Sequence, residues 1–235
     1  MAKTSKRIPQ ELRPRELLAA YASGVFPMPD PDEPGELLWF SPDPRCLLPL
    51  DERFHVSRRL AATLRQGRFV CTLDGDFGGV MRACGRRREG TWINRDFLAA
   101  YGQLHRLGFA HSVEAYVSAA WADLHPRRRS KAHPARAKAA APGNRQAPAA
   151  KGPLAGGVYG VAIGGAFFAE SMFHRVTDAG KAALVFLVEH LRRQGFVLCD
   201  VQWLTPNLAR YGACEIRRWE YLDLLATAIG KGVQF

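Results

Sequence analysis

The sequence predicts an α+β fold, with helices and strands arranged in mixed layers. Its 235 residues are 47% hydrophobic and 23% charged, which is enough apolar material for a buried core. The first half mixes predicted helices with short strands. The second half is predicted to run strand, strand, helix, strand. This length corresponds to one large domain or two small ones.

Glycine and proline mark the ends of the elements expected in the first half. A short helix within 13–23 ends at Gly24, with Pro27 beyond it, and residues 37–51 form an extended stretch rich in proline. The elements that follow are helices at 57–66, 77–85 and 95–107 and strands at 68–73 and 111–117.

The second half has a more regular pattern. Two strands meet at Gly164-Gly165, which suits a hairpin turn. Asp178 is expected to cap a helix that ends at Gly195, and the strand 196–203 follows. Two further helices are expected at 205–211 and 221–229.

The net charge of +11 comes mostly from one segment. No acidic residue lies between Asp123 and Glu170, whereas eight Lys and Arg do; without these, 25 basic residues face 22 acidic ones. The stretch 124–153 is rich in Ala, Pro, Arg and Lys, so we expect a mobile basic insertion. It is either a solvated insertion without function or an arm that attracts phosphates.

The sequence favours a cytoplasmic protein that does not enter a membrane. No apolar run approaches the ~20 residues of a membrane span, and the basic N-terminus lacks the apolar core of a secretory signal. The five cysteines are odd in number and never at CxxC spacing. They are typical of reduced thiols and not of a disulfide framework or a zinc site.

The strand 196–203 carries the first candidate site. Because side chains alternate along a strand, Asp200 and Gln202 share one face, and Cys199, Val201 and Trp203 the other, together with Val197. A carboxylate and an amide therefore point the same way near the end of an interior strand. They are either a structural hydrogen-bonded pair or an acid/base and positioning pair at a cleft.

Glu170 raises the same alternatives, because it lies within the apolar run 166–173. It either forms a structural ion pair with Arg175 or Lys181, or it marks a site. Two histidines, His105 and His111, and the adjacent Ser112 match no nucleophile or metal motif. These residues alone predict a cleft protein with a carboxylate pair and leave its reaction open.

Several blocks, in order from Leu12 to Glu220, resemble the leucyl/phenylalanyl-tRNA–protein transferase family. The blocks are YASGVFP, WFSPDPR, TWI, AYGQLHRLGFAHSVE, GGVYGVAIGGAFFAESMFH, DAGKAALVFLVEHLRRQGF, DVQ and YGACEI. The resemblance implies a small N-terminal domain, 1–60, and a catalytic domain like an N-acetyltransferase, 61–235, interrupted by the basic insertion. It also implies transfer of Leu or Phe from aminoacyl-tRNA to the α-amine of proteins that begin with Arg or Lys, which marks them for degradation.

The resemblance further assigns the site residues. Asp200, Gln202 and Glu170 would lie at the reacting centre, and Trp92 and Met28 at the terminal adenosine of the tRNA. The amino-acid pocket would consist of Val158, Phe167, Met172, Leu184, Leu187, Leu191 and Cys199. The reaction needs no cofactor and no metal, because the aminoacyl ester is already activated.

This chain departs from the family pattern at several positions. Val158, Leu187 and Leu191 stand where Met or Phe is frequent. Met28 stands where tryptophan is usual, Gly180 replaces the serine of ASK, and Asn207 replaces a histidine. Three alternatives remain open. They are a non-catalytic tRNA-binding protein, a transferase that has lost activity through the changes at Met28 and Gly180, and an acyl-CoA-dependent N-acyltransferase, although HRVTDAGKAAL lacks a pyrophosphate loop. We expect a monomer.

Overall fold

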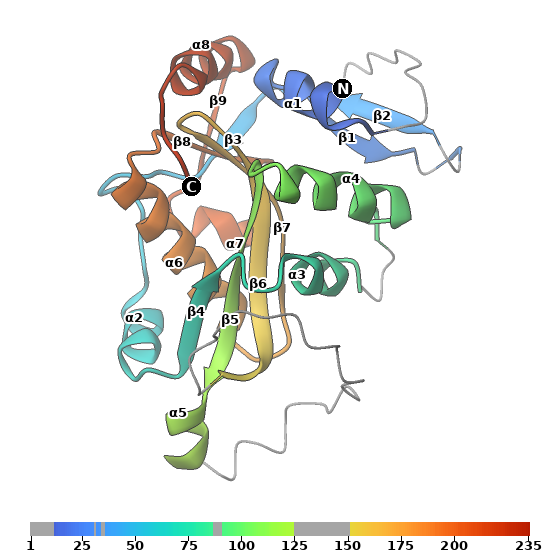
Figure 1. Ribbon diagram of the computed structural model, residues 1–235. Coiled ribbons are helices and arrows are strands. Elements are labelled where there is room, and N and C mark those ends of the chain that lie inside the picture. Colours follow the sequence, from blue (N-terminus) through green and yellow to red (C-terminus); the bar gives the residue numbers. More distant parts are fainter. Residues whose placement is uncertain (1–11, 31, 34–35, 87–90, 125–150) are drawn as a thin grey trace.

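The computed structural model describes residues 12–30, 32–33, 36–86, 91–124 and 151–235 (Figure 1). A seven-stranded mixed sheet has helices on both of its faces, and a small two-stranded sheet lies beside it with the first helix. This arrangement confirms the predicted α+β class, with a small N-terminal part and a larger C-terminal part.

The N-terminal part consists of α1 (Pro14–Ala22), β1 (Phe26–Pro29) and β2 (Leu37–Phe40). Pro14 occupies the first turn of α1, where a missing N–H costs nothing. The helix ends just before Gly24, whose φ of +73° allows the chain to turn into β1. The two strands pair antiparallel, with Phe26 opposite Phe40.

The large sheet begins at β4 and ends at β9. Its strands, in spatial order, are β4 (Phe69–Leu73), β5 (Ala110–Ser118), β6 (Lys151–Ile163), β7 (Ala166–His174), β8 (Leu198–Gln202), β3 (Arg45–Leu47) and β9 (Cys214–Ile216). All neighbours pair antiparallel except β7 and β8. The strand that carries Asp200 and Gln202 is therefore an interior strand, as predicted.

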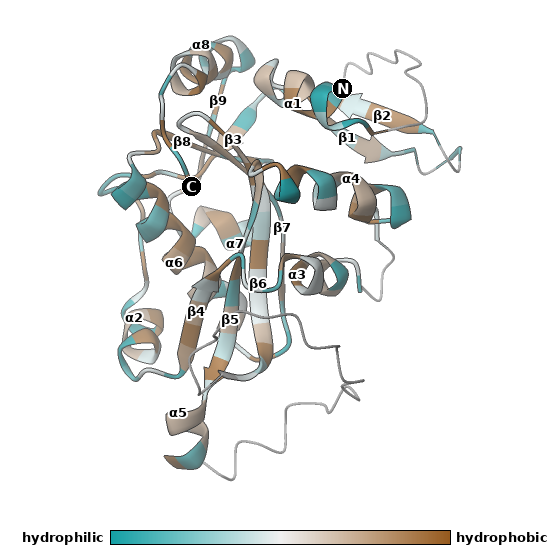
Figure 2. Ribbon diagram, in the orientation of Figure 1, coloured by the Kyte–Doolittle hydropathy of each residue, from teal (hydrophilic) through white to brown (hydrophobic). Residues whose placement is uncertain are grey.

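Helices cover the sheet on both faces. They are α2 (Arg58–Arg65), α3 (Phe77–Cys84), α4 (Arg95–Arg106), α5 (Ala119–Leu124), α6 (Ala179–Gln194), α7 (Pro206–Ala209) and α8 (Arg218–Ile229). One core cluster joins α1, α3, α4 and α8, and the other joins α6 and α2 to the sheet. Apolar residues follow α6 and the central strands in Figure 2, as burial requires.

The predicted elements of both halves are confirmed, with small shifts at their ends. The predicted cap is wrong: Asp178 precedes α6 but makes no capping hydrogen bond, because its φ is +71° and its carboxylate accepts from the Lys181 Nζ at 2.8 Å.

The ends of the expected insertion lie in regular structure. Leu124 ends α5, and β6 begins at Lys151, while 125–150 lie outside the described residues. The boundary expected at residue 60 stays a prediction, although β3 already belongs to the large sheet. Within the described ranges, none of the helices has the length and apolar character needed to cross a membrane.

Candidate active site

A pocket of about 350 Å³ is lined by β1, the middle of β7 and the end of β8. Its lining residues are Phe26, Pro27, Met28, Trp92, Val158, Ala169, Glu170, Ser171, Met172, Leu184, Val201, Gln202, Trp203, Thr205, Asn207 and Leu208. Among these described residues, Glu170 is the one acidic or basic side chain. The pocket is therefore mostly apolar, with one carboxylate in its wall.

A β-bulge turns Glu170 into this pocket. Ala169 pairs with Gly160 and Ser171 with Tyr159, so Glu170 is the extra residue that opposes no partner on β6. Residues 169, 170 and 171 then all line the pocket, which a regular strand would not allow. The bulge thus explains how a carboxylate within an apolar strand reaches the pocket.

Burial sets the protonation of Glu170. Loss of solvent raises the pKa of this carboxyl to about 7, although the Tyr21 hydroxyl, which donates to Oε1 at 2.7 Å, works in the opposite direction. Gln202 Nε2 donates to the same oxygen at 3.2 Å. Neither Arg175 nor Lys181 contacts Glu170: Arg175 donates to the Leu154 carbonyl and Lys181 to Asp178. The ion pair considered as the structural alternative is therefore wrong.

Gln202 ends β8 in an unusual backbone conformation. Its φ is +62°, and the Trp203 N–H donates to the Val201 carbonyl at 2.8 Å, which closes a γ-turn. Such a turn is strained and is maintained by its surroundings. Here the carboxylate of Asp200 accepts the Gln202 N–H at 2.9 Å.

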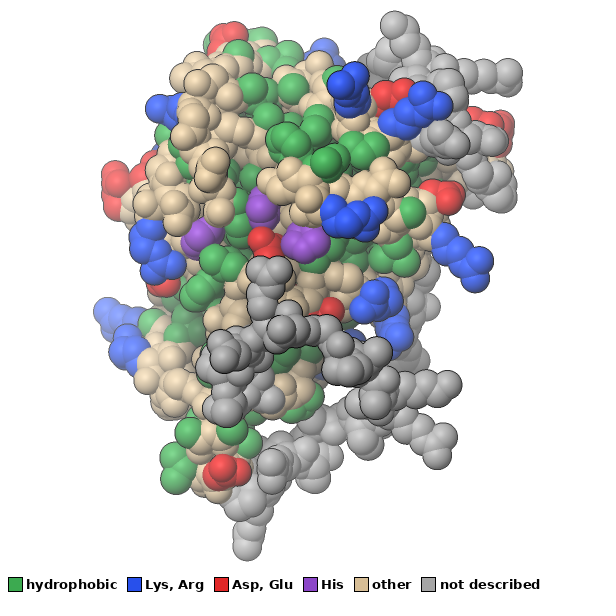
Figure 3. Space-filling model, viewed as in Figure 1, with side chains coloured by type: hydrophobic (Ala, Val, Ile, Leu, Met, Phe, Trp, Pro, Cys, Tyr) green, Lys and Arg blue, Asp and Glu red, His purple; other side chains and the backbone are tan. Residues whose placement is uncertain are grey.

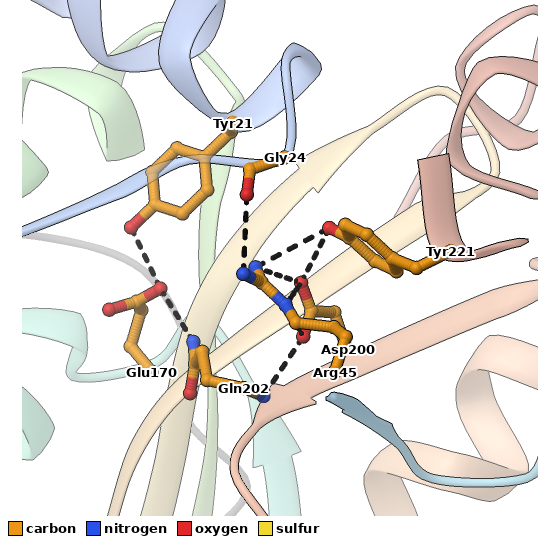
Figure 4. A network of polar contacts seen from close by, with 7 residues as sticks. All are labelled: Tyr21, Gly24, Arg45, Glu170, Asp200, Gln202 and Tyr221. Atoms are coloured by element: carbon orange, nitrogen blue, oxygen red, sulfur yellow. Dashed lines mark hydrogen bonds and ion pairs between the residues drawn. The ribbon is translucent and has the colours of Figure 1, made fainter. Parts of the chain in front are cut away.

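Asp200 is fully buried and does not line the pocket. It lies among Arg45, Tyr221 and Gln202 (Figure 4). Its two oxygens accept from Arg45 Nε at 2.9 Å, from Arg45 Nη2, from the Tyr221 hydroxyl at 2.7 Å and from the Gln202 N–H. Arg45 is also buried and donates to the Gly24 carbonyl at 3.2 Å. Asp200 therefore contacts the backbone of Gln202, whereas the Gln202 side chain contacts Glu170.

The chain is similar to known members of a named family. Family models described as leucyl/phenylalanyl-tRNA protein transferase match residues 47–122 and 149–226, and the N-terminal domain model of that family matches 10–43. Leucyl/phenylalanyl-tRNA–protein transferases of Herpetosiphon aurantiacus and Akkermansia muciniphila are 43% and 41% identical over 220 residues each. These alignments cover 94% and 93% of this chain and 96% of each relative.

The chain belongs to the leucyl/phenylalanyl-tRNA–protein transferase family. The resemblance noted in the sequence is thereby confirmed over nearly its full length. Among solved structures, that of FemX superposes with a TM-score of 0.48 at 12% identity, covering 86% of this chain and 66% of FemX.

The pocket brings together most of the residues that family resemblance predicts. Glu170, Gln202, Trp92 and Met28 line it, together with Val158, Met172 and Leu184 from the predicted amino-acid pocket. The remaining predicted residues are almost completely buried and do not line it: Phe167, Leu187, Leu191, Cys199 and Asp200. They pack beneath the site.

Two of the departures from the family pattern also lie at this site. Asn207 lines the pocket. Gly180 lies where α6 approaches β7: a Cβ there would be 2.8 Å from the Phe173 carbonyl oxygen and 3.3 Å from Met172 Cγ. Glycine therefore permits a close approach of helix and strand behind the pocket residue Met172.

Sequence reasoning missed four side chains of this polar network: Tyr21, Tyr101, Arg45 and Tyr221. Tyr21 and Tyr101 bring their hydroxyls together beside Glu170, and burial raises the pKa of both phenols well above the usual value. Both lie at positions of an amphipathic helix typical of a core residue, so periodicity does not single them out. Arg45 stands within WFSPDPR, and a basic residue in an extended stretch is normally solvated.

The histidines lie elsewhere. Figure 3 shows histidine side chains gathered around an acidic side chain on the face viewed. His111 Nδ1 is 2.8 Å from Asp74 Oδ2, and His105 Nδ1 is 3.9 Å from Asp74 Oδ1. Ser112 donates to buried Glu114 at 2.5 Å. In the part of the chain that the structure describes, no three His, Cys, Asp or Glu side chains are arranged to hold a metal ion.

Proposed function

We propose that this chain transfers leucine or phenylalanine from aminoacyl-tRNA to the α-amine of proteins that begin with Arg or Lys. The observation that carries the proposal is the meeting of Glu170 and Gln202 at the wall of a mostly apolar pocket, in a chain of this family. The product carries a new N-terminal Leu or Phe, which would mark it for degradation in the cytoplasm. The chain is proposed to act as a monomer.

The reaction is aminolysis of an ester. The attacking amine forms a C–N bond with the ester carbonyl, the C–O bond to the tRNA ribose breaks, and the amine proton passes to the departing 3′ oxygen. Because the ester is already activated, catalysis requires mainly the correct placement of amine and carbonyl and stabilisation of the developing charge.

Glu170 is the proposed proton acceptor for the amine. A carboxyl with a pKa of about 7 is close to the ordinary pKa of an α-amine, ~8, so proton transfer between them is nearly balanced. The Gln202 amide N–H is used by Glu170, which leaves the amide oxygen of Gln202 to accept from the attacking amine. The two side chains would then orient the nucleophile between them.

Asp200 is proposed as a positioning residue. All of its near contacts are donors from the protein, and it has no exposed surface for substrate. Its role is to hold the Gln202 backbone in the γ-turn that directs the amide into the pocket. Arg45 neutralises the negative charge of the buried Asp200 carboxylate.

The apolar pocket residues are proposed to receive the side chain of the transferred amino acid. Val158, Met172 and Leu184 line this part, and Phe167 and Leu187 support it from beneath. Each buried methylene contributes about 0.8 kcal/mol, which favours Leu and Phe over Ala.

A transfer assay tests the proposal. The protein is mixed with radiolabelled Leu-tRNA or Phe-tRNA and peptides that differ only in their first residue, Arg, Lys, Ala or Asp, without ATP or acetyl-CoA. We expect label on the Arg and Lys peptides. Binding of charged tRNA without transfer to any peptide would favour a non-catalytic tRNA-binding protein, and label that requires acyl-CoA would favour an N-acyltransferase.

A further inference from the structure

Trp203 is a large aromatic side chain in the pocket wall to which the proposed mechanism gives no role. It is 38% exposed, yet Phe26 and Phe40 hold it in edge-to-face contacts with ring centroids 5.0 Å and 6.1 Å away. An indole that is fixed by neighbours and still open to a pocket presents a surface for a ligand.

The γ-turn at Gln202 places this indole next to the reacting groups. In a regular strand, consecutive side chains point to opposite faces. Here Val201, Gln202 and Trp203 all line the same pocket, because the left-handed conformation of Gln202 reverses the alternation. One strained residue therefore directs both the amide and the indole into the pocket.

The chemistry of the donor indicates which group would lie next to Trp203. This step rests on the proposed function. In every aminoacyl-tRNA the amino acid is esterified to the ribose of the terminal adenosine, so a flat base lies one sugar away from the ester. An ester held at Gln202 and Glu170 thus carries an adenine within reach of the adjacent residue.

The surroundings of Trp203 favour a neutral base over a cation. Its neighbours Phe26 and Phe40 are apolar, and of the described pocket-lining residues only Glu170 carries an acidic group. The Arg or Lys side chain of an acceptor would lose hydration there without a second carboxylate. A neutral base loses little hydration on burial, and any base can stack on an aromatic ring.

We propose that Trp203 stacks on the terminal adenine of the donor tRNA and holds the ester at Gln202. Met28 lines the same pocket and offers a flexible thioether but no flat ring. Trp92, expected at the same adenosine, also lines the pocket and packs edge-to-face on Phe97. Trp203 supplies a second fixed aromatic face, directly beside Gln202 in the chain.

Binding of two small donor analogues tests this proposal. One is adenosine that carries phenylalanine in a stable 3′-amide linkage, and the other is the same compound without the base. The variants are Trp203→Ala, Trp203→Phe and, as a matched control, Trp219→Ala, whose indole is 68% exposed on α8 outside the pocket. Wild-type transfer to an Arg peptide is measured in parallel.

Trp203→Ala should weaken binding of the adenosine analogue about tenfold and leave binding of the base-free compound unchanged. Trp203→Phe should retain most of the affinity, and Trp219→Ala should match wild type. Equal weakening of both compounds, or a raised KM for the Arg peptide alone, would overturn the proposal. If the wild type transfers but Trp203→Ala binds normally, only this inference fails; absence of wild-type transfer rejects the proposed function itself.

Discussion

Two opposing effects act on the carboxyl of Glu170. Burial raises its pKa, whereas the hydrogen bond from Tyr21 and the distant positive charge of Arg45 lower it, and the outcome is a pKa of about 7. The hydroxyls of Tyr21 and Tyr101 remain protonated, because burial raises their own pKa values. Tyr21 therefore serves as a donor to Glu170 over the whole physiological pH range.

The rate of transfer should depend on the ionisation of Glu170. As the pH falls below about 7, the carboxylate gains a proton and can no longer accept one from the amine, so kcat should fall. Glu170→Gln should lower kcat about 100-fold and remove this step from the profile of kcat against pH. A variant that keeps the wild-type profile would show that another group titrates.

The same shift predicts a cost in stability. The unfolded carboxyl has a pKa of 4.5 and the folded one about 7, so the folded state binds more protons between these values and stability falls as the pH rises. Glu170→Gln should therefore raise the free energy of unfolding at pH 8, by up to about 3 kcal/mol, and much less at pH 5. Urea unfolding at both pH values measures this; an equal effect at both would contradict the assignment.

At the scale of elements, the Arg45–Asp200 pair connects four separate parts of the chain. Arg45 on β3 binds Asp200 on β8, Tyr221 on α8 donates to the same carboxylate, and the Gly24 carbonyl after α1 accepts from Arg45 (Figure 4). The end of β8 that carries Asp200 and Gln202 is thus fixed from several sides.

Breaking this pair should be costly. Arg45→Met leaves the carboxylate of Asp200 buried without its cation, and we expect a loss of about 3–5 kcal/mol in the free energy of unfolding. Arg53→Ala is the control, because its ion pair with Asp51 is exposed and should change the melting temperature little. Similar effects of the two substitutions would contradict the structural role of the buried pair.

The contact of α6 with β6 predicts a second pair of variants. A Cβ at Gly156 would lie 2.6 Å from the backbone of Ala179, so Gly156→Ala should destabilise the fold by about 1–3 kcal/mol. Gly102 lies inside α4 with its nearest neighbour at 3.8 Å, so Gly102→Ala should stabilise by about 0.5–1 kcal/mol. Thermal unfolding measures this: the melting temperature should fall for Gly156→Ala and rise for Gly102→Ala.

Hydrophobic periodicity, and the glycines and prolines at element ends, were sufficient to predict most helices and strands from the sequence. They failed where local geometry departs from regular structure. The alternation rule put Trp203 on the face opposite Gln202, because nothing in DVQW signals the γ-turn. The sequence also gives no signal of the β-bulge at Glu170. Nor does it indicate that Arg45 pairs with Asp200, 155 positions away. The sequence pattern singled out Glu170 and Gln202, and family resemblance added the other predicted residues that line the pocket.

At the scale of the whole molecule, the pocket depends on both parts of the chain. Met28 and Phe26 come from the N-terminal sheet, whereas Glu170 and Gln202 come from the large sheet. Tyr21 of α1 also donates to Glu170. The shape of the pocket and the arrangement of Glu170 and Gln202 therefore both depend on how the two parts pack.

The uneven charge predicts a salt-dependent contact with tRNA. Residues 124–169 contain eight Lys and Arg and no acid. Deletion of 126–150 should weaken tRNA binding at low salt and reduce the slope of log Kd against log salt, with little effect on the single-turnover rate at saturating tRNA. An unchanged affinity and slope would show that the segment has no part in tRNA binding.

The most direct test of the account is the single-turnover transfer rate of Gln202→Ala with Phe-tRNA and an Arg peptide, measured beside the affinity for the charged tRNA. We expect a rate lower by about 100-fold or more and an affinity close to that of wild type. A wild-type rate would contradict the placement of the reaction at Gln202 and Glu170. An equally large loss of affinity would assign Gln202 to tRNA binding alone.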